Sequence, residues 1–466
     1  MTHITFLGAA QTVTGSRHLL QTANGHQVLV DCGMFQGLKA LRERNWQGLG
    51  VPPSAIDAVV LTHAHLDHVG WLPRLVSAGF HGPVYCTPGT RDLCTLVLPD
   101  AGRIQEEDAR QANRHAYSRH APALPLFTET DALRALALLQ PVGFATPVEV
   151  VPGLTGEFLR AGHLLGSSFV RMRQQEAPRT IVFGGDLGRF GRPVLPDPAT
   201  VTDADVLLVE STYGDRSHGA DDDGAALAEV IGTTHARGGR LVIPSFAIGR
   251  VEELLYWLQR LEQEGRIPTM PVYVDSPMAA EAIDFYSARA DELDPELGHA
   301  LHGPMFNTRR LHIVRSVEES KALTRSAGPA IIISASGMAT GGRVLHHLKH
   351  LLPDPKNTVL FVGFQAAGTR GRLLIDGAAT VKIHGELIPV EARVVRNDQM
   401  SAHADRDEIL RWLRGFTSPP SRTFLVHGEP APMAALSAQI TRELGWHVTM
   451  PRHGERVALA PNPPHA

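Results

Sequence analysis

The order of apolar segments along the chain constrains its fold more than any other feature. The first 213 residues contain short apolar runs separated by turns, among them "HITFLG", "QVLVDCG", "TIVFGGD" and "ADVLLVES". Runs of this length and composition predict strands. Two intervening stretches, "RDLCTLVLPDAGRIQEEDARQANRHAYSRHA" and "ETDALRALALLQ", have helical spacing and few helix breakers. This part of the chain therefore predicts a sandwich of sheets with helices outside.

From about residue 214 the pattern changes to strand and helix in alternation. "RLVIPSF" precedes "RVEELLYWLQRLEQEG", and "AIIISAS" precedes "RVLHHLKHLL". Continuous apolar strands between helices predict a parallel sheet covered on both faces. After about residue 390 the chain returns to "EARVVRN" and "RTFLVHG", with two further amphipathic helices. We therefore predict an α/β protein whose first domain comprises residues 1–213 and 390–466, with a second domain at residues 214–389.

Length and composition agree with a soluble, multidomain protein. A chain of 466 residues is about three times the ~150 residues usual for one domain. The net charge of -4 does not indicate a nucleic-acid-binding protein, so a polyanionic substrate would need local positive charge. Three scattered cysteines, the lack of a signal peptide and the lack of an apolar run of ~18 residues predict a cytoplasmic location. The tail "APNPPHA" is expected to be frayed.

Four ligand-type residues stand within six positions of the stretch "VVLTHAHLDHVG". His63 and His65 alternate after an apolar strand, and Asp67 and His68 lie where the next helix begins. A single histidine at a strand end is more often structural. Neutral imidazoles with a carboxylate are the donors that a borderline-soft divalent ion prefers. The cluster therefore predicts a metal site.

Further candidate ligands follow other apolar strands. His163 follows "FLRAG", Asp186 follows "IVFGG" and His427 follows "TFLV". Each one alone could be a turn or capping residue, but the recurrence of the same placement favours a shared site. Asp31, in "VLVDCG", is similarly placed, and it could equally orient the histidines by hydrogen bonding from behind them.

With these residues, the chain resembles the metallo-β-lactamase superfamily, through the H-x-H-x-D-H signature, and specifically its β-CASP branch of nucleic-acid-processing nucleases. The resemblance covers nearly the whole chain. The motifs that carry it are "GAAQTVTGS", "DCGMFQG", "THAHLDHVG", "AGHLLGSS", "GGDLGR", "VESTYGDRSH", "PSFAIGR", "SASGMATGGRVLHHL", "KIHGE", "MSAHADRDE" and "LVHGE".

The resemblance implies a metallo-β-lactamase αββα sandwich with an inserted α/β β-CASP domain. It implies two zinc ions per chain, with these ligands: His63, His65 and His163 on one ion, Asp67, His68 and His427 on the other, and Asp186 bridging. It also places Glu210 in the family's motif A, His403 in motif B and His427 in motif C.

Two divalent ions lower the pKa of water and clamp a phosphodiester, which serves its hydrolysis. The expected catalytic residues are Asp67, His403 and Glu210. His403 is the candidate general acid, and on the family's geometry Glu210 orients it and helps to keep it protonated. Without the resemblance, His403 would be interpreted as a turn residue before the helix that starts at "DRDEIL".

The substrate is expected to meet small and basic residues. Ser334, Ser336 and Gly337 end a strand at the mouth of a helix, where free backbone N–H groups suit phosphate oxygens, and Ser401 offers another hydroxyl. The candidates for positive charge are Arg250, Arg343, Arg370, Arg372 and Lys382. For each arginine singly, a surface salt bridge is as well supported as a phosphate contact.

The leading hypothesis is a zinc-dependent ribonuclease that cleaves single-stranded RNA, mainly as an endonuclease, in RNA processing or decay. The motif "MSAHAD" resembles the endonuclease-type members, including the cleavage subunit of eukaryotic pre-mRNA 3'-end processing. "MSAHAD" and "GFQAAGTRGR" depart from the corresponding patterns of ribonuclease J. The alternatives are a 5'-exoribonuclease or DNA nuclease of the same branch, a small-molecule metallo-hydrolase, or a non-catalytic RNA-binding subunit. No membrane partner is expected, and a homodimer stays open.

Overall fold

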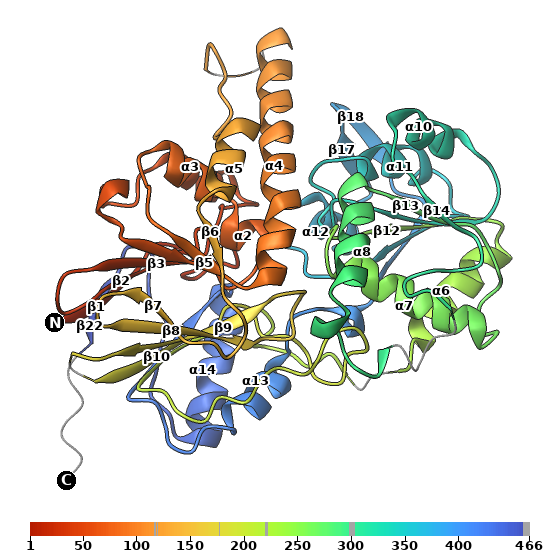
Figure 1. Ribbon diagram of the computed structural model, residues 1–466. Coiled ribbons are helices and arrows are strands. Elements are labelled where there is room, and N and C mark those ends of the chain that lie inside the picture. The colour runs from red at the N-terminus through yellow and green to blue at the C-terminus, as the bar shows by residue number, and fades with distance from the viewer. Residues whose placement is uncertain (116–117, 119, 177, 220–221, 298–302, 460–466) are drawn as a thin grey trace. The chain divides into compact units, whose positions relative to one another are not determined.

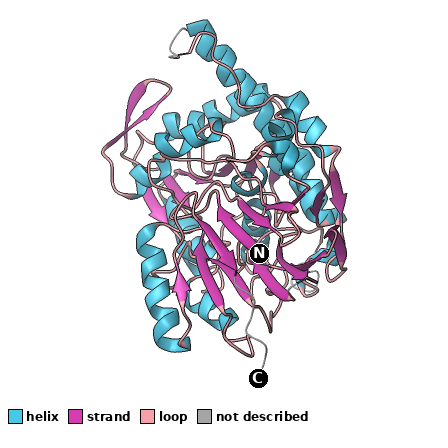
Figure 2. Ribbon diagram, turned by 90° about the vertical axis from the view of Figure 1, so that its left-hand side faces the viewer, coloured by secondary structure: helices cyan, strands magenta, loops and turns pink. Residues whose placement is uncertain are grey.

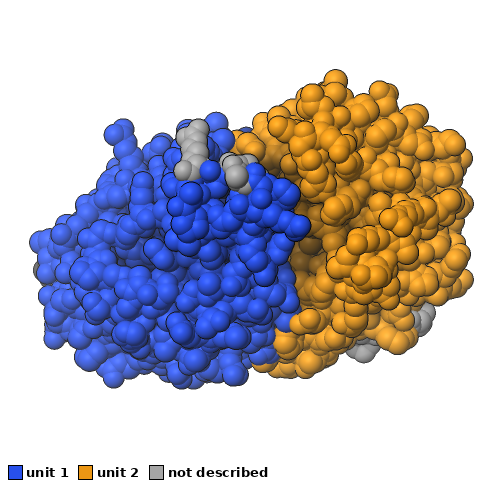
Figure 3. Space-filling view, turned by 90° about the horizontal axis from the view of Figure 1, so that it is seen from above, with its two compact units in different colours: residues 1–190, 197–217, 403–466 blue, residues 191–196, 218–402 orange. Residues whose placement is uncertain are grey.

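The computed structural model describes residues 1–115, 118, 120–176, 178–219, 222–297 and 303–459. These residues form two compact units, which Figure 3 colours separately. The first unit comprises Met1–Phe190, Asp197–Ser217 and the chain from His403 onward. The second comprises Gly191–Pro196 and His218–Ala402. The tail at 460–466 lies outside the described residues.

Two seven-stranded sheets build the first unit. Figure 1 labels many of their strands, and Figure 2 draws the strands in magenta. The first sheet, in spatial order, contains β22 (Arg456–Leu459), β1 (Thr2–Phe6), β2 (His18–Gln21), β3 (Gln27–Val30), β4 (Ala58–Val60), β5 (Val84–Cys86) and β6 (Leu139–Pro141). The second contains β21 (Val448–Thr449), β20 (Arg422–Val426), β11 (Val206–Glu210), β10 (Arg179–Phe183), β9 (Ser168–Gln174), β8 (Leu154–Arg160) and β7 (Val148–Val151).

The core of the first unit lies between these two sheets. Ile4 and Val30 of the first sheet pack in one buried cluster with Phe158, Phe183 and Phe424 of the second. Burial in β1 alternates along the strand, as expected for a strand with one face on a core. The two sheets therefore form the sandwich that the sequence predicts.

Helices accompany both sheets of the first unit. The helices that follow strands of the first sheet in the chain are α1 (Lys39–Glu43), α2 (Leu66–Val69), α3 (Leu72–Ser77), α4 (Pro88–His115) and α5 (Glu129–Leu136), with 3-10 turns at Arg44–Trp46 and Pro53–Ala55. Helices α13 (Arg406–Leu413) and α14 (Pro430–Leu444) cover the second sheet, where Trp412 and Leu436 share a buried cluster with Val209 and Leu425. The layers are those of an αββα sandwich.

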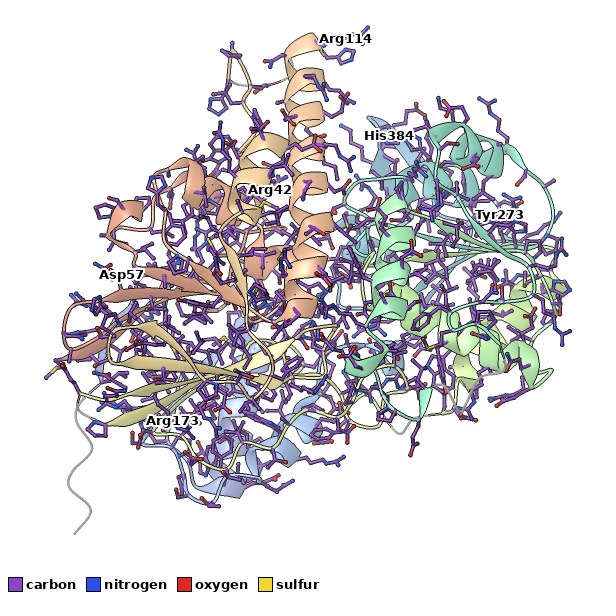
Figure 4. The ribbon with its side chains drawn as sticks, in the orientation of Figure 1. Arg42, Asp57, Arg114, Arg173, Tyr273 and His384 are labelled. Atoms are coloured by element: carbon purple, nitrogen blue, oxygen red, sulfur yellow. The ribbon has the colours of Figure 1, made fainter. Side chains whose placement is uncertain are left out.

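Helix α4 contains most of the long helical stretch that the sequence predicts from residue 91. It has 28 residues, and Figure 4 shows Arg114 at its outer end. The predicted helical stretch continues to residue 121, but residues 116, 117 and 119 lie outside the described part of the chain. Helix α5 begins at a capping box, in which the Thr128 hydroxyl accepts from the Asp131 amide and the Asp131 carboxylate accepts from the Thr128 amide.

The second unit is built on a parallel six-stranded sheet. Its strands, in spatial order, are β14 (Leu311–Ile313), β13 (Val272–Asp275), β15 (Ala330–Ser334), β12 (Arg240–Pro244), β16 (Thr358–Phe361) and β19 (Arg393–Arg396). Its helices are α6 (Ala225–Ala236), α7 (Arg250–Gln263), α8 (Pro277–Ala288), α10 (Val317–Arg325), α11 (Val344–Leu351) and α12 (Arg370–Ile375), with 3-10 turns at Ala290–Glu292 and Asp398–Met400. A hairpin of β17 (Thr380–Ile383) and β18 (Glu386–Pro389) completes the unit.

The second unit includes a segment that the sequence assigned to the first domain. The stretch "EARVVRN" was expected after the return to the first domain, but β19 pairs with β16 in the second unit's sheet, with Val359 opposite Val394. An apolar strand gains its hydrogen bonds from whichever sheet edge it reaches, and composition does not identify that edge. The α/β class and the two-part architecture are confirmed.

Among the described residues, no helix is both long enough and apolar enough to span a membrane.

Candidate metal centre

Six strands of the first unit end at a candidate polar residue or within three residues before one. Strands β3 and β4 run parallel in one sheet, and β10, β11 and β20 run parallel in the other. β8 runs with β10 because each is antiparallel to β9. The residues carried at these carboxyl ends are Asp31, His63, His163, Asp186, Glu210 and His427. The recurrence of polar strand ends seen in the sequence therefore corresponds to one region of the fold.

The backbone at these strand ends turns sharply. Asp31 and His427 have φ angles of 59° and 49°, in the left-handed region that non-glycine residues rarely adopt. Gly33 lets the next loop approach closely, because a Cβ there would lie 1.6 Å from the carbonyl oxygen of Asp67. The Asp67 carbonyl also accepts a 2.7 Å hydrogen bond from the amide of Ser16. These contacts fix the short loop that carries Asp67.

One group of donor atoms comes from three histidines and an aspartate. Nδ1 of His65 lies 3.1 Å from Nε2 of His63 and 3.2 Å from Nε2 of His163. Oδ2 of Asp186 lies 3.4 Å from Nε2 of His63 and 3.5 Å from Nε2 of His163. All four side chains are buried or nearly so, and their donor atoms point at one another.

A second group lies on the other side of Asp186. Nε2 of His427 is 3.3 Å from Nε2 of His68 and 3.3 Å from Oδ2 of Asp67. Oδ1 of Asp186 is 3.3 Å from Nε2 of His68. Asp186 thus presents one carboxylate oxygen to each group, and neither oxygen accepts a hydrogen bond from the described residues.

These distances fit metal coordination. Zinc binds histidine nitrogen at about 2.0–2.1 Å in tetrahedral sites, which places neighbouring ligand atoms about 3.3 Å apart. The donor separations given above range from 3.1 to 3.5 Å, which brackets this value. A buried carboxylate with no hydrogen-bond donor also needs a cation to offset its charge. The residues present therefore fit a metal centre.

Burial keeps three of the histidines in the neutral, ligand-competent form. Burial lowers the pKa of His63 and of His163, and it lowers the pKa of His65 to about 3. His68 differs from these three. Burial alone would lower the pKa of His68, but the neighbouring carboxylates Asp186 and Asp31 raise it above its ordinary value. A bound cation would compete with this proton.

Asp31 lies behind the second group. Its Oδ2 is 2.7 Å from Nδ1 of His68, and its Oδ1 accepts from the amide of Thr62 at 2.8 Å. The hydroxyls of Ser16 and Thr62 also donate to this carboxylate. Accepting from Nδ1–H of His68 leaves its Nε2 facing the other donors. Of the two roles that the sequence left open for Asp31, the geometry favours orientation of His68.

His403 and Glu210 form a pair beside the first group. Nδ1 of His403 is 3.0 Å from Oε2 of Glu210, and the second carboxylate oxygen of Glu210 accepts from the amide of Leu187 at 2.6 Å. Nδ1 of His403 lies 3.8 Å from Asp186. Against the effect of burial, Glu210 and Asp186 raise the pKa of His403 to about 9. The His403 side chain is 15% exposed, so it is the part of this pair that a substrate can reach.

The predicted substrate-binding residues lie in the second unit, and most already have partners there. Ser334 is buried, and its hydroxyl donates to the Asp275 carbonyl. Arg250 is buried and pairs with Glu253 at 2.6 Å. Arg343 contacts the Asp275 carboxylate at 2.8 Å.

The remaining predicted residues differ in how much they expose. The Ser336 hydroxyl accepts from the Thr340 amide, and a Cβ at Gly337 would lie 2.7 Å from the ring of Phe246. Ser401 is buried. Three basic residues complete the set. Arg370 donates to the Lys382 carbonyl at 2.8 Å, Arg372 pairs with Asp376 at 2.9 Å, and the Lys382 side chain is exposed.

Sequence reasoning missed the hydroxyl groups around the ligands. Thr62, Ser16 and Thr212 all hydrogen bond to carboxylates or histidines of the site. The available signal was position: Thr62 directly precedes His63, and Thr212 follows Glu210 by two residues.

Three family models match the chain. The metallo-beta-lactamase superfamily model matches residues 18–225, the Beta-Casp domain model matches residues 251–374, and the model of a Zn-dependent metallo-hydrolase RNA specificity domain matches residues 387–451.

The chain also matches relatives along most of its own length. The chain is 41% identical over 455 residues to Ribonuclease TTHA0252 of Thermus thermophilus, covering 97% of this chain and 99% of that protein. It is 32% identical to Transcription termination factor FttA of Methanocaldococcus jannaschii, covering 91% of this chain and 67% of that protein. A crystal structure of a protein of unknown function from Enterococcus faecalis V583 shares the fold, with a TM-score of 0.55, 14% identity and coverage of 98% of this chain and all of that one. The chain therefore belongs to the metallo-β-lactamase superfamily, in its β-CASP branch.

Proposed function

We propose that this protein is a zinc-dependent ribonuclease that hydrolyses phosphodiester bonds of single-stranded RNA, mainly as an endonuclease, in the cytoplasm. The observation that carries the proposal is the pair of donor groups that share Asp186, with the His403–Glu210 pair beside them. The names of the relatives, a ribonuclease and transcription termination factors, and the match to an RNA specificity domain support RNA as the substrate.

Seven residues are the proposed zinc ligands. One ion would be held by His63, His65 and His163, the other by Asp67, His68 and His427, and Asp186 would contact both. When bound, two such ions lower the pKa of water toward neutrality and offset the charge that develops on phosphate oxygens. Asp31 supports this set by holding the Nδ1 side of His68.

His403 is the proposed general acid. Glu210 holds its Nδ1, and the raised pKa of His403 means that the imidazole stays protonated near neutral pH. Nδ1 of His403 faces Glu210, and Nε2 is the nitrogen that we propose delivers a proton to the departing oxygen. Asp67 completes the proposed catalytic set, because its carboxylate also faces the second donor group.

The exposure of each basic side chain decides how strong a candidate it is for a contact with RNA. Arg372 and Lys382 have exposed side chains, so they are the strongest candidates for phosphate contacts. Arg250 and Arg343 support the second unit through Glu253 and Asp275, and their proposed contribution to RNA binding acts through that support.

Chelation and zinc addition test the proposal. Zinc-loaded protein should cleave a single-stranded RNA, chelated protein should not, and added zinc should restore cleavage with about two equivalents bound per chain. Turnover of a β-lactam or a thioester without RNA cleavage would instead support a small-molecule hydrolase. RNA binding without cleavage at full zinc occupancy would support a non-catalytic subunit.

A further inference from the structure

We infer that Thr212 is a positioning residue that links Glu210 to His427, and that its hydroxyl selects the His427 tautomer whose Nε2 is free to bind a metal. The inference rests on the proposed metal-dependent function for its purpose. Its evidence is the hydrogen-bond geometry of the Thr212 side chain, which belongs to the first unit, as do Glu210 and His427.

Thr212 lies between the two residues that it would link. Its side chain is buried, and its Oγ1 is 2.6 Å from Oε2 of Glu210 and 3.1 Å from Nδ1 of His427. The chain around it is tied to the end of β20, because Ser211 donates from its hydroxyl to the Val426 carbonyl and from its amide to the His427 carbonyl. Thr212 therefore has little freedom to turn away.

The single hydroxyl proton of Thr212 can go to only one acceptor. The 2.6 Å separation from Glu210 lies in the range of a charge-assisted O–H···O⁻ hydrogen bond, whereas the His427 carbonyl is 3.2 Å away. The proton therefore goes to Glu210. Nδ1 of His427 lies 3.1 Å from Oγ1 of Thr212 and 3.5 Å from Oδ1 of Asp186, and both oxygens call for a hydrogen on this nitrogen. The shorter contact makes Oγ1 of Thr212 the acceptor of that hydrogen.

This arrangement sets the direction of the metal-binding nitrogen. With the hydrogen on Nδ1, the lone pair of His427 is on Nε2, which faces Asp67 and His68 at 3.3 Å each. Asp31 does the same for His68 by accepting from its Nδ1. Thr212 differs from Asp31 because it also holds Glu210, the partner of His403, so one hydroxyl joins a proposed ligand to the proposed acid.

The test compares zinc affinity among three variants. Thr212→Val keeps the shape and removes the hydroxyl, Thr212→Ser restores the hydroxyl, and Thr423→Val makes the same change at another buried threonine. Thr423 is a suitable control because its hydroxyl has no hydrogen-bond partner among the described residues. Affinity is measured by chelator competition on the purified full chain.

We expect Thr212→Val to bind one of its two zinc equivalents about 10- to 100-fold more weakly, as is usual when a partner of a metal-binding histidine is removed. Thr212→Ser and Thr423→Val should keep the parental affinity. Parental affinity in Thr212→Val, or equal losses in Thr212→Val and Thr423→Val, would overturn the inference.

A second measurement needs no folded Thr212 variant. Nitrogen-15 NMR of the zinc-loaded wild-type protein reports which ring nitrogen of His427 carries hydrogen, with His427→Gln used to assign the signals. The inference predicts hydrogen on Nδ1 and zinc on Nε2, and zinc on Nδ1 would overturn it. Both readouts are independent of RNA: a protein that shows them but does not cleave RNA would refute the proposed function alone.

Discussion

Replacing Glu252 by glutamine should stabilise the protein increasingly as the pH rises. Glu252 lies in the first turn of α7, is fully buried, and its two carboxyl oxygens make no well-formed hydrogen bond with the described residues. Burial raises the pKa of Glu252 from 4.5 to about 8, against smaller opposing effects of the amides of Gly249 and Glu252 and of the Arg250 charge.

The sign and size follow from proton linkage. Between pH 4.5 and about 8 the folded protein keeps the Glu252 proton while the unfolded chain loses it, so stability falls as the pH rises through this window. One pKa unit corresponds to about 1.4 kcal/mol, so the shift contributes a loss of about 5 kcal/mol at most. Glutamine does not ionise and escapes this loss. Its buried amide has a cost of its own, but that cost does not depend on pH.

The assay is urea unfolding of both proteins between pH 5 and pH 8.5, followed by tryptophan fluorescence. The free energy of unfolding of Glu252→Gln minus that of the wild type should increase by about 4 kcal/mol across this range, because a small part of the loss is already present at pH 5. Glu281→Gln, at an exposed glutamate of α8, is the matched control and should show a constant difference. A pH-independent difference for Glu252→Gln would refute the reasoning.

Three further predictions concern the site. His403→Ala should lower single-turnover cleavage by about 10²- to 10⁴-fold with zinc content and RNA affinity retained, while His427→Ala should lose zinc together with activity; parental cleavage in His403→Ala would remove the general-acid role. Asp186→Ala should hold fewer than two zinc ions by metal analysis, because each carboxylate oxygen faces a different donor group, and two tightly held ions would contradict the bridging role. RNA affinity should fall as the salt concentration rises, because the phosphates contact local basic residues. An RNA affinity that does not change with salt concentration would rule out that contact.

The sequence predicted most of the site because its residues follow recognisable strands. His63, His163, Asp186 and His427 each stand at or just after the end of an apolar run, and parallel strands present their carboxyl ends together. The strand pattern thus made these four residues candidate ligands, whereas their division between two ions was implied by the family resemblance. The geometry brings all seven of the proposed ligands together.

The supporting contacts were less accessible to sequence reasoning. The role of Thr212 depends on the register between β11 and β20, which puts Glu210 opposite Val426 and so brings His427 within reach. Apolar patterning does not specify that pairing. Arg250 shows a related limit, because its partner Glu253 is visible at a helical spacing of three, but the burial of both side chains depends on tertiary packing. The predicted phosphate contacts therefore stay predictions.

The most direct test of the account is the cleavage of a circular single-stranded RNA by the zinc-loaded protein. A circle offers no end to an exonuclease, so a first cut must be internal. The account predicts that the circle is converted to a linear product, that chelator abolishes this reaction, and that His403→Ala slows it without loss of zinc. Degradation of a linear RNA from its 5' end, with the circle left intact under the same conditions, would contradict the account.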